Sequence, residues 1–413
     1  MNRWEQTFTI AQGMSVTIEN RVGPVSVQGW GENYVKVVAT AADEDLAERM
    51  EVGQDGRGLT VRVHRGRGGL FGIFGDGAPV SLVVQVPMAT PCHVEVGSGA
   101  VNIQETHGTV DLETGSGGVN LTAVTEAVVN TGSGGVNVRQ VHGRLRVETG
   151  SGAINAQEIY GEAALDTGSG HVVVRGVRSG VVVDTGSGNI TVADVAGSAS
   201  LDTGSGSVTV ERLRGDSLVV DTGGGRVQLK AIDVTTLEVD TSSGRVEAEL
   251  LAIAPNGSYE IDTGSGGVDI ALPAGADLTV EVDSGSGRIT HTGLPLQVHH
   301  SESGELEAQL GRGGPTLSID SGSGAVVLRA AQPGARGDAH VDAPVVPAAP
   351  PVPPAPPAPP APEARVMRAV SGDPALESSD QLRRVLAMVE QGKLTPEEAE
   401  EILRALDEEG APA

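Results

Sequence analysis

The sequence has little of several residue types, and each shortage excludes a class of protein. Cys92 is the single cysteine among 413 residues, so neither an internal disulfide nor a cysteine-rich metal site can form. Aromatic residues make up only 2% of the chain, whereas a compact domain of this size would bury many more rings. The core is therefore expected to be thin and built from small aliphatic side chains.

Positive charge and long apolar runs are also scarce. The 28 Lys and Arg residues stand against 54 Asp and Glu, a net charge of −26 that would repel nucleic acid and anionic membranes. No segment approaches the roughly 18 apolar residues of a transmembrane span. The first 13 residues, MNRWEQTFTIAQG, lack the apolar run of a signal peptide. These features predict a cytoplasmic protein with no nucleic-acid partner and no transmembrane span; the alternative is a membrane-associated one.

Glycine, in contrast, is abundant, at 59 residues, and much of it belongs to a repeat. The tripeptide Gly-Ser-Gly, or a variant of it, recurs every 17 to 22 residues in thirteen copies. The residues that precede the turn are Val96, Thr114, Thr131, Thr149, Thr167, Thr185, Thr203, Thr222, Thr241, Thr263, Ser284, Ser301 and Ser321. A fixed period of this length predicts stacked coils, each of which buries its apolar face against its neighbours.

Within one copy the apolar residues alternate with polar ones. Val181, Val183 and Thr185 share one face, while Asp184 points away from it, and this period of two is typical of strands with one buried face. Each copy is expected to hold two or three short strands, separated by the Gly-Ser-Gly turn and by a second turn near Gly176. Glycine suits such corners because it adopts a positive φ without steric cost. The predicted fold class is all-β, a β-solenoid of about 18-residue coils.

The sequence Asp-Thr-Gly-Ser is also the signature of an aspartic protease, but the repeat explains it better. A protease brings two aspartates together by two-fold symmetry, whereas translation by one coil produces a ladder. The acidic residues predicted to form one outward column are Glu95, Glu113, Glu148, Asp166, Asp184, Asp202, Asp221, Asp240, Asp262, Asp283 and Asp320, interrupted at Asn130 and His300. The Thr and Ser hydroxyls inside the corner are expected to satisfy the turn amides.

The acidic column has two interpretations. Calcium would relieve the repulsion between stacked carboxylates, but a solvated edge that discourages sideways pairing is favoured. The nine histidines show no zinc-ligand spacing, and His299 and His300 should point to opposite faces because they are strand neighbours. No catalytic residue, cofactor or metal ligand is therefore predicted.

The two ends of the chain differ from the repeat. Residues 1–90 hold strand-like runs without the turn and are predicted to cap the solenoid of residues 91–330; within them, ENRVGPVSV at 19–27 looks like a degenerate coil. The capping region contains an apolar loop at residues 65–77, with Leu70, Phe71, Ile73 and Phe74. This loop either contacts a membrane or a partner, or folds over the end of the core.

A Pro-rich linker at residues 331–377, expected to be disordered, leads to a predicted helical hairpin at residues 378–409. Apolar residues at helical spacing form a stripe on each helix: Leu382, Val385, Leu386 and Val389 on the first, and Ile402, Leu403 and Leu406 on the second. Two helices of about twelve residues cannot bury such stripes alone. The hairpin is therefore expected to self-associate or to dock on a protein partner.

Three features together resemble a known family: the repeated TGSGxVxV coils, the run VPMATP at residues 86–91, and the strand pattern of residues 1–90. They are similar to the bacterial putative-adhesin family, a domain of unknown function, over about residues 1–330. The tail LRRVLAMVEQGKLTPEEAEEILRAL is similar to the short helical-hairpin domain of the YvlB and LiaX group of envelope-stress proteins. The resemblance implies a right-handed β-solenoid, no enzymatic activity, and a role in envelope stress or surface interaction.

Three functions remain open from the sequence. The favoured one is a non-enzymatic scaffold or interaction protein with a tethered helical oligomerisation or partner-docking module. The second is an envelope-stress sensor or adhesin-like protein that contacts membrane or cell wall peripherally. The third is a carbohydrate-active β-helix enzyme, which the shortage of aromatic residues disfavours.

Overall fold

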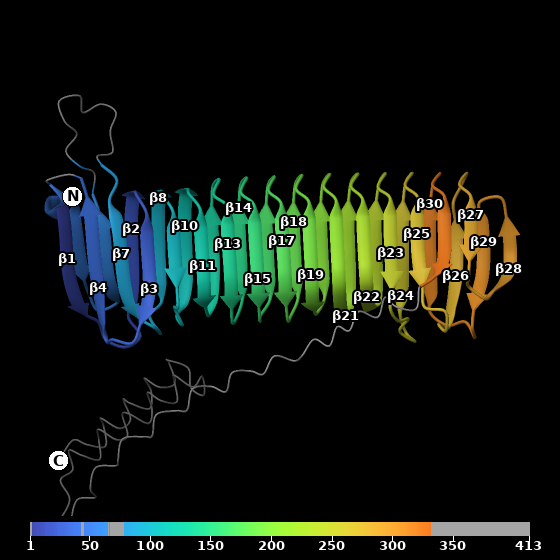
Figure 1. Cartoon of the computed structure of the whole chain (residues 1–413), viewed down its shortest axis with the longest axis horizontal. Helices are drawn as coiled ribbons and strands as arrows, with labels where there is room; N and C mark the ends of the chain where they lie inside the picture. Colours follow the sequence, from blue (N-terminus) through green and yellow to red (C-terminus); the bar gives the residue numbers. More distant parts are fainter. Residues whose placement is uncertain (1, 43–44, 65, 67–77, 332–413) are drawn as a thin grey trace, which may run out of the picture. The chain divides into compact units, whose positions relative to one another are not determined.

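The structure, a computed structural model, describes residues 2–42, 45–64, 66 and 78–331. These residues form 31 strands and one four-residue helix, α1 (Leu46–Arg49). Figure 1 shows the strands stacked side by side along the solenoid. The all-β solenoid expected from the repeat is confirmed. The predicted linker beyond residue 331, the predicted hairpin and most of the apolar loop lie outside the described residues.

Each central coil contributes two strands, one to each of two faces. The coil of β17 (Val172–Val177) and β18 (Val181–Thr185) is typical. On the first face, β17 pairs in parallel with β15 (Ile154–Ile159) and β19 (Ile190–Ala196). On the second face, β18 pairs in parallel with β16 (Ala163–Thr167) and β20 (Ala199–Thr203). Equivalent residues lie directly opposite one another in every such pair, so each position of the repeat becomes a column along the stack.

The first face, called face A, contains in spatial order β1 (Asn2–Thr9), β4 (Tyr34–Ala41), β7 (Ser81–Pro87), β3 (Val25–Trp30), β9 (Val101–Gln104), β11 (Val119–Val124), β13 (Val136–Val141), β15, β17, β19, the first parts of β21 (Val208–Thr222) and β22 (Val227–Thr241), β23 (Val246–Leu250), β25 (Val268–Leu272), β31 (Val326–Ala330) and β27 (Ile289–Thr292).

The second face, called face B, contains β5 (Met50–Gln54), β6 (Gly58–Val63), β2 (Ser15–Val22), β8 (Cys92–Ser98), β10 (Thr109–Ser116), β12 (Glu126–Thr131), β14 (Leu145–Thr149), β16, β18, β20, the second parts of β21 and β22, β24 (Ser258–Thr263), β30 (Thr316–Ser321), β26 (Leu278–Asp283), β29 (Glu305–Leu310) and β28 (Leu296–Glu302).

The core lies between the two faces and consists of stacked Val, Ile, Leu and Ala side chains. In β18 the inward residues Val181, Val183 and Thr185 are 1% exposed, whereas Val182 is 54% exposed. Tyr259 is the one aromatic residue fully buried in the described core, where it stacks between Leu237 and Leu317. Its hydroxyl donates to the carbonyl of Val234 at 3.1 Å and accepts from the amide of Ala254 at 2.8 Å. The expectation of a thin aliphatic core is confirmed.

The coils do not stack in sequence order near the ends, which corrects the simple series expected from the repeat. The coil that ends at Ser321 inserts between those of Thr263 and Ser284, because β30 pairs with both β24 and β26 (Figure 1). Ser301 belongs to no coil; it lies in the antiparallel hairpin of β28 and β29. At the other end, residues 15–30 do form a coil, but it is not the first of the stack. Its strand β2 lies between β6 and β8, and its strand β3 lies between β7 and β9.

Antiparallel strands flank the N-terminal end of the stack on both faces and the C-terminal end on face B, whereas face A ends there on β27, which pairs in parallel with β31. At the N-terminal end β1, β4 and β5 run against their neighbours, and at the C-terminal end β28 and β29 do so. The outermost strands β1 and β28 are mostly exposed and carry polar residues. An open sheet edge invites pairing with another chain, and the polar, exposed side chains of these edge strands limit such growth of the sheet.

The Gly-Ser-Gly corner is held by the buried hydroxyl predicted from the sequence. Thr185 Oγ1 accepts from the amide of Gly188 at 3.1 Å and donates to the carbonyl of Gly170, one coil earlier, at 3.2 Å. The same pair of bonds recurs at Thr149, Thr167, Thr203, Thr222, Thr263 and Ser321. Each hydroxyl therefore satisfies one turn amide and links two coils, which confirms the expected ladder.

The reason for glycine in this corner differs from the one expected. Gly186 and Gly188 are not among the residues with positive φ. A Cβ on Gly188 would instead lie 1.8 Å from the carbonyl oxygen of Gly170. Glycine is required here because the backbones of successive coils approach too closely for any side chain.

Candidate interaction site at the N-terminal end

The residues that the sequence singles out for binding lie outside the described residues. This holds for the loop residues Leu70, Phe71, Ile73 and Phe74, and for the stripes of residues 382–389 and 402–406. The described residues on either side of the loop do locate its two ends. Arg49, which is buried, donates from Nε to the carbonyl of His64 at 3.1 Å and from a terminal nitrogen to the carbonyl of Ala78 at 2.9 Å. One guanidinium therefore pins both ends of the loop to the capping region.

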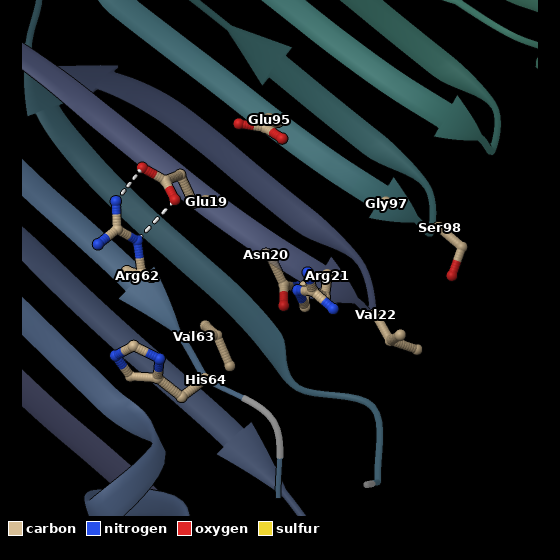
Figure 2. Close-up of a pocket in the computed structure, with 10 residues that line it drawn as sticks. All are labelled: Glu19, Asn20, Arg21, Val22, Arg62, Val63, His64, Glu95, Gly97 and Ser98. Carbon is tan, nitrogen blue, oxygen red and sulfur yellow. Dashed lines mark hydrogen bonds and ion pairs between the residues drawn. The ribbon is translucent and has the colours of Figure 1, made fainter. Parts of the chain in front are cut away.

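A charged hollow lies beside the point where this loop leaves the fold, as Figure 2 shows. It is lined by the last residues of three neighbouring strands of face B: Glu19, Asn20, Arg21 and Val22 of β2, Arg62 and Val63 of β6 with the adjoining His64, and Glu95, Gly97 and Ser98 of β8. The three strands run parallel and end together, so their polar termini are brought to one edge. Glu19 lies directly opposite both Arg62 and Glu95 in the ladder.

Ion pairs define the electrostatics of the hollow. Arg62 binds the carboxylate of Glu19 through two bonds, from Nε at 2.6 Å and from a terminal nitrogen at 2.7 Å. This bidentate pair lowers the pKa of Glu19 below its usual range and raises the pKa of Arg62. His64 Nε2 lies 2.5 Å from Glu51 Oε2, and that same carboxylate oxygen is 3.7 Å from Arg62. Both signs of charge thus alternate across the hollow.

Asn20 forms part of the hollow's floor and replaces the threonine of later coils. Its side chain is 2% exposed, and Nδ2 donates to the carbonyls of Val80 at 2.9 Å and Gly23 at 3.2 Å. Val80 is where the chain re-enters face A after the apolar loop. The Asn20 amide holds β2 and the returning chain together, as a threonine hydroxyl links two coils at Thr185. The sequence contains no signal for this role, because it depends on a contact across 60 residues.

The acidic column predicted from the repeat is present and longer than expected, but His300, predicted to interrupt it, lies outside it, opposite Glu307. It runs along face B from Glu19 through Glu95 to Asp262, continues through Asp320 and Asp283, and ends on Glu305 and Glu302. Burial, and then the repulsion of neighbouring carboxylates, raise the pKa values of Asp166, Asp202 and Asp262. A groove lies beside the first part of the column, where glycines occupy the adjacent outward position.

The geometry of the column does not support peptide cleavage. Asp166, Asp184 and Asp202 are related by translation along parallel strands, with each carboxylate on its own coil. No two of them converge on one proton, as an aspartic protease requires. The sequence-based rejection of the protease therefore agrees with the described structure.

Other reactive groups are also unsuited to catalysis. Cys92 is buried, and burial raises the pKa of its thiol to about 12, so it is not a thiolate nucleophile at neutral pH. Tyr160 is half-exposed, but His142 stacks against its ring with centroids 5.2 Å apart, and Arg178 lies 4.8 Å from the ring centroid. Because these residues belong to the preceding and following coils, both faces of the Tyr160 ring are covered. Tyr160 therefore cannot serve as a stacking platform for a sugar ring.

Within the part of the chain that the structure describes, no helix has the length and apolar character needed to cross a membrane.

Comparison with known families gives two matches. The model of the family described as Toastrack DUF4097 matches residues 15–179 and again residues 175–329. The model described as a SHOCT-like domain matches residues 380–411, which includes most of the predicted hairpin. The search among curated proteins gives no match.

Three solved structures are similar to parts of the chain at low identity. A "putative cell adhesion protein" from Clostridium sporogenes is 9% identical, with a TM-score of 0.20 over 80% of this chain and 100% of the other. A "putative lipid binding protein" from Parabacteroides distasonis is 14% identical, with a TM-score of 0.25 over 79% and 96%. A "putative adhesin" from Bacteroides fragilis is 7% identical, with a TM-score of 0.19 over 80% and 97%. The assignment of the chain to a family rests on the family models and not on these structures.

Proposed function

Because the chain belongs to the Toastrack DUF4097 family, we propose that it is a non-enzymatic, adhesin-like scaffold that binds a protein or a surface. The observation that carries this proposal is the repetition of one exposed pattern. Columns such as Asp166, Asp184 and Asp202 recur on successive coils in constant register. A partner with repeated groups can contact many equivalent positions at once, and the summed contacts give binding without a deep pocket.

The C-terminal hairpin provides the docking or oligomerisation module of this scaffold. The match of residues 380–411 to a SHOCT-like domain supports a separate module there, and its apolar stripes need a cover that two short helices cannot supply. The module is proposed to act independently of the solenoid, because the composition of the segment between them is typical of a spacer. The scaffold is proposed to be cytoplasmic, which cell fractionation with an antibody to the solenoid tests.

Sedimentation velocity of the full chain tests the module. Leu386→Asp and Leu403→Asp place a charge on each stripe, and each should convert a self-associated wild type to monomer or abolish capture of the partner. Ala387→Asp introduces the same charge off the stripe and should leave association unchanged. A monomeric wild type whose tail captures nothing, or equal effects of all three variants, would exclude the docking role.

Contact with a membrane through the apolar loop is a second candidate function. The supporting observation is that Arg49 pins both ends of the loop beside the exposed hollow. The chain should then float with phosphatidylcholine vesicles, and Phe71→Asp with Phe74→Asp should abolish flotation. Vesicles that contain phosphatidylglycerol should bind less, because the chain carries a net charge of −26. Flotation that the two substitutions do not change would rule out the loop as the contact.

A further inference from the structure

The C-terminal cap places a histidine beside two glutamates. In the hairpin of β28 and β29, His300 Nε2 lies 3.7 Å from a carboxylate oxygen of Glu305 and 3.9 Å from one of Glu302. One ligand atom from each of the three side chains lies within 4.8 Å of the other two. Among the described residues this group alone combines three such ligands. The cap stands at the C-terminal end of the stack in Figure 1.

A bulge in β28 gives His300 this position. The register shifts between Val298 and His300, so that Val298 faces Ala308 while His300 faces Glu307. Because of the extra residue, His299 and His300 both reach the outward side, where His299 Nε2 lies 3.3 Å from Gln309 Oε1. The expectation that the two histidines point to opposite faces is therefore wrong. Glu302 and Glu305 are opposite one another across the two-residue turn, which brings both carboxylates to His300.

The surrounding charge favours a cation at this position. Outward carboxylates of the neighbouring strands lie in the same two columns: Glu307 opposite His300, Asp283 beside Glu305, and Asp320 beyond Asp283. His300 and the two glutamates have no lysine or arginine partner among the described ion pairs. A bound divalent ion would offset the repulsion of these carboxylates.

We propose that His300, Glu302 and Glu305 form a site for a divalent transition-metal ion such as Zn²⁺. One imidazole nitrogen and two carboxylate oxygens are a ligand set that suits zinc, with water in the remaining position. Ligand atoms around a tetrahedral zinc ion are about 3.4 Å apart at the usual bond lengths. The separations of 3.7 and 3.9 Å therefore need only small side-chain movements, and the exposed glutamates are free to make them. Calcium fits less well, because it prefers six to eight oxygen ligands.

The ion would fasten the outermost strand of face B. β28 has few buried side chains and pairs on one side only, with β29. A metal held by His300 and Glu302 of β28 and by Glu305 of β29 ties the two strands together near their turn. The site thus stabilises the cap at this end of face B.

Isothermal titration of the tag-free full chain with zinc chloride tests the proposal. We expect one saturable site per chain at micromolar concentration, weakened at least about tenfold in His300→Gln and in Glu302→Gln. His299→Gln is the matched control: it removes the neighbouring imidazole and should leave binding within about twofold of wild type. Amide hydrogen exchange in β28 should slow on addition of zinc in the wild type and in His299→Gln, but not in His300→Gln.

Several outcomes would overturn the site. These are no saturable zinc binding below about 1 mM, binding retained in both His300→Gln and Glu302→Gln, or equal losses in the His299 and His300 variants. Calcium binding of equal strength that is independent of His300 would place the ion on the acidic column instead. Circular dichroism of each variant, expected to match the wild type because all the altered side chains are on the surface, shows whether a loss of binding comes from unfolding.

Discussion

Two columns of the repeat constrain the backbone in different ways: the third residue of the Gly-Ser-Gly turn, and a residue near the end of each face A strand, just before the second turn. At the Gly-Ser-Gly corner the third residue of the turn has an ordinary backbone conformation, but a Cβ there would collide with the preceding coil, at 1.8 Å for Gly188. In the second column, within strands such as β15 and β19, the backbone takes a left-handed conformation, with φ of +58° at Glu158 and +59° at Asp194. Between them in the stack lies Gly176, where a Cβ would have room, its nearest neighbour being 3.7 Å away.

The difference between the two columns shows that close approach of backbones constrains the residue type more strongly than a left-handed φ does. Close approach of backbones excludes every side chain, so glycine recurs at the Gly-Ser-Gly corner from coil to coil. A left-handed φ costs a residue with a side chain only about 1–2 kcal/mol, so this second column tolerates many residues. The residues with positive φ in this column are Glu105, Ala123, Gln140, Glu158, Gly176, Asp194, Arg212 and Ala231. Stacking sterics, rather than φ, therefore set the sequence signature of the fold.

The largest change in stability is expected when a side chain is added at the Gly-Ser-Gly corner. Gly188→Ala would place Cβ 1.8 Å from the oxygen of Gly170 and 2.8 Å from Thr185 Oγ1, and relief requires the coils to separate. We expect a loss of about 3 kcal/mol in the free energy of unfolding, measured by chemical denaturation. Gly180→Ala is the control, because its Cβ would meet nothing closer than 3.6 Å; it should change stability by less than about 1 kcal/mol. Equal losses in the two variants would contradict the steric explanation.

Removal of a hydroxyl from the ladder at the same corner should give the next largest loss of stability. Thr185→Val keeps the shape of the side chain but leaves the amide of Gly188 and the carbonyl of Gly170 without their buried partner. We expect a loss of about 2 kcal/mol, read from the denaturation midpoint. Thr191→Val makes the same change on the outward side of β19 and should be nearly neutral. If Thr185→Val were equally neutral, the threonine column would stabilise the fold through the packing of its side chains and not through its hydrogen bonds.

The left-handed column near the end of the face A strands should respond in the opposite direction to the Gly-Ser-Gly corner. Ala231, with φ of +56°, and Gly176, with φ of +70°, occupy the same column. Ala231→Gly should stabilise the protein by about 0.5 kcal/mol, because the relief of strain exceeds the added chain entropy. Gly176→Ala should destabilise it by about 1 kcal/mol, because it adds the strain without a clash. Thermal melting of both variants checks the signs, and a loss in Ala231→Gly would show that strain is absent from this column.

The sequence predicts the interior of the solenoid well because each coil repeats the same local information. The alternation around Val183, the hydroxyl of Thr185 and the outward Asp184 all follow from a period of two within a period of about eighteen. The order of coils at the ends does not follow, since Thr263, Ser284 and Ser321 carry the same signature. Which of them stack is decided by contacts between distant segments, and the spacing does not reveal it, because the widely spaced Thr241 and Thr263 do lie on neighbouring coils.

The candidate sites were less predictable than the fold for the same reason. Arg49, Asn20 and the group around His300 act through partners across a sheet or a hairpin, and no periodic pattern marks them. At His300 one extra residue in β28 reverses the expected direction of a side chain. A period-based argument assigns faces by counting, so a single bulge is enough to defeat it.

The smallest change in stability is expected from substitutions in the acidic column, whose side chains are mostly in solvent. The pKa values of Asp166, Asp202 and Asp262 are raised by burial and by their neighbours. Their contribution to stability is therefore fully present below the ordinary pKa of 3.8 and is lost as the pH rises through the raised values. Changing all three to Asn should raise the melting temperature slightly at pH 7, with the gain vanishing near pH 4. Asp277→Asn should do the reverse at pH 7, because Arg312 lowers the pKa of Asp277. A triple variant that melts below the wild type at pH 7 would indicate that a bound cation holds the column together.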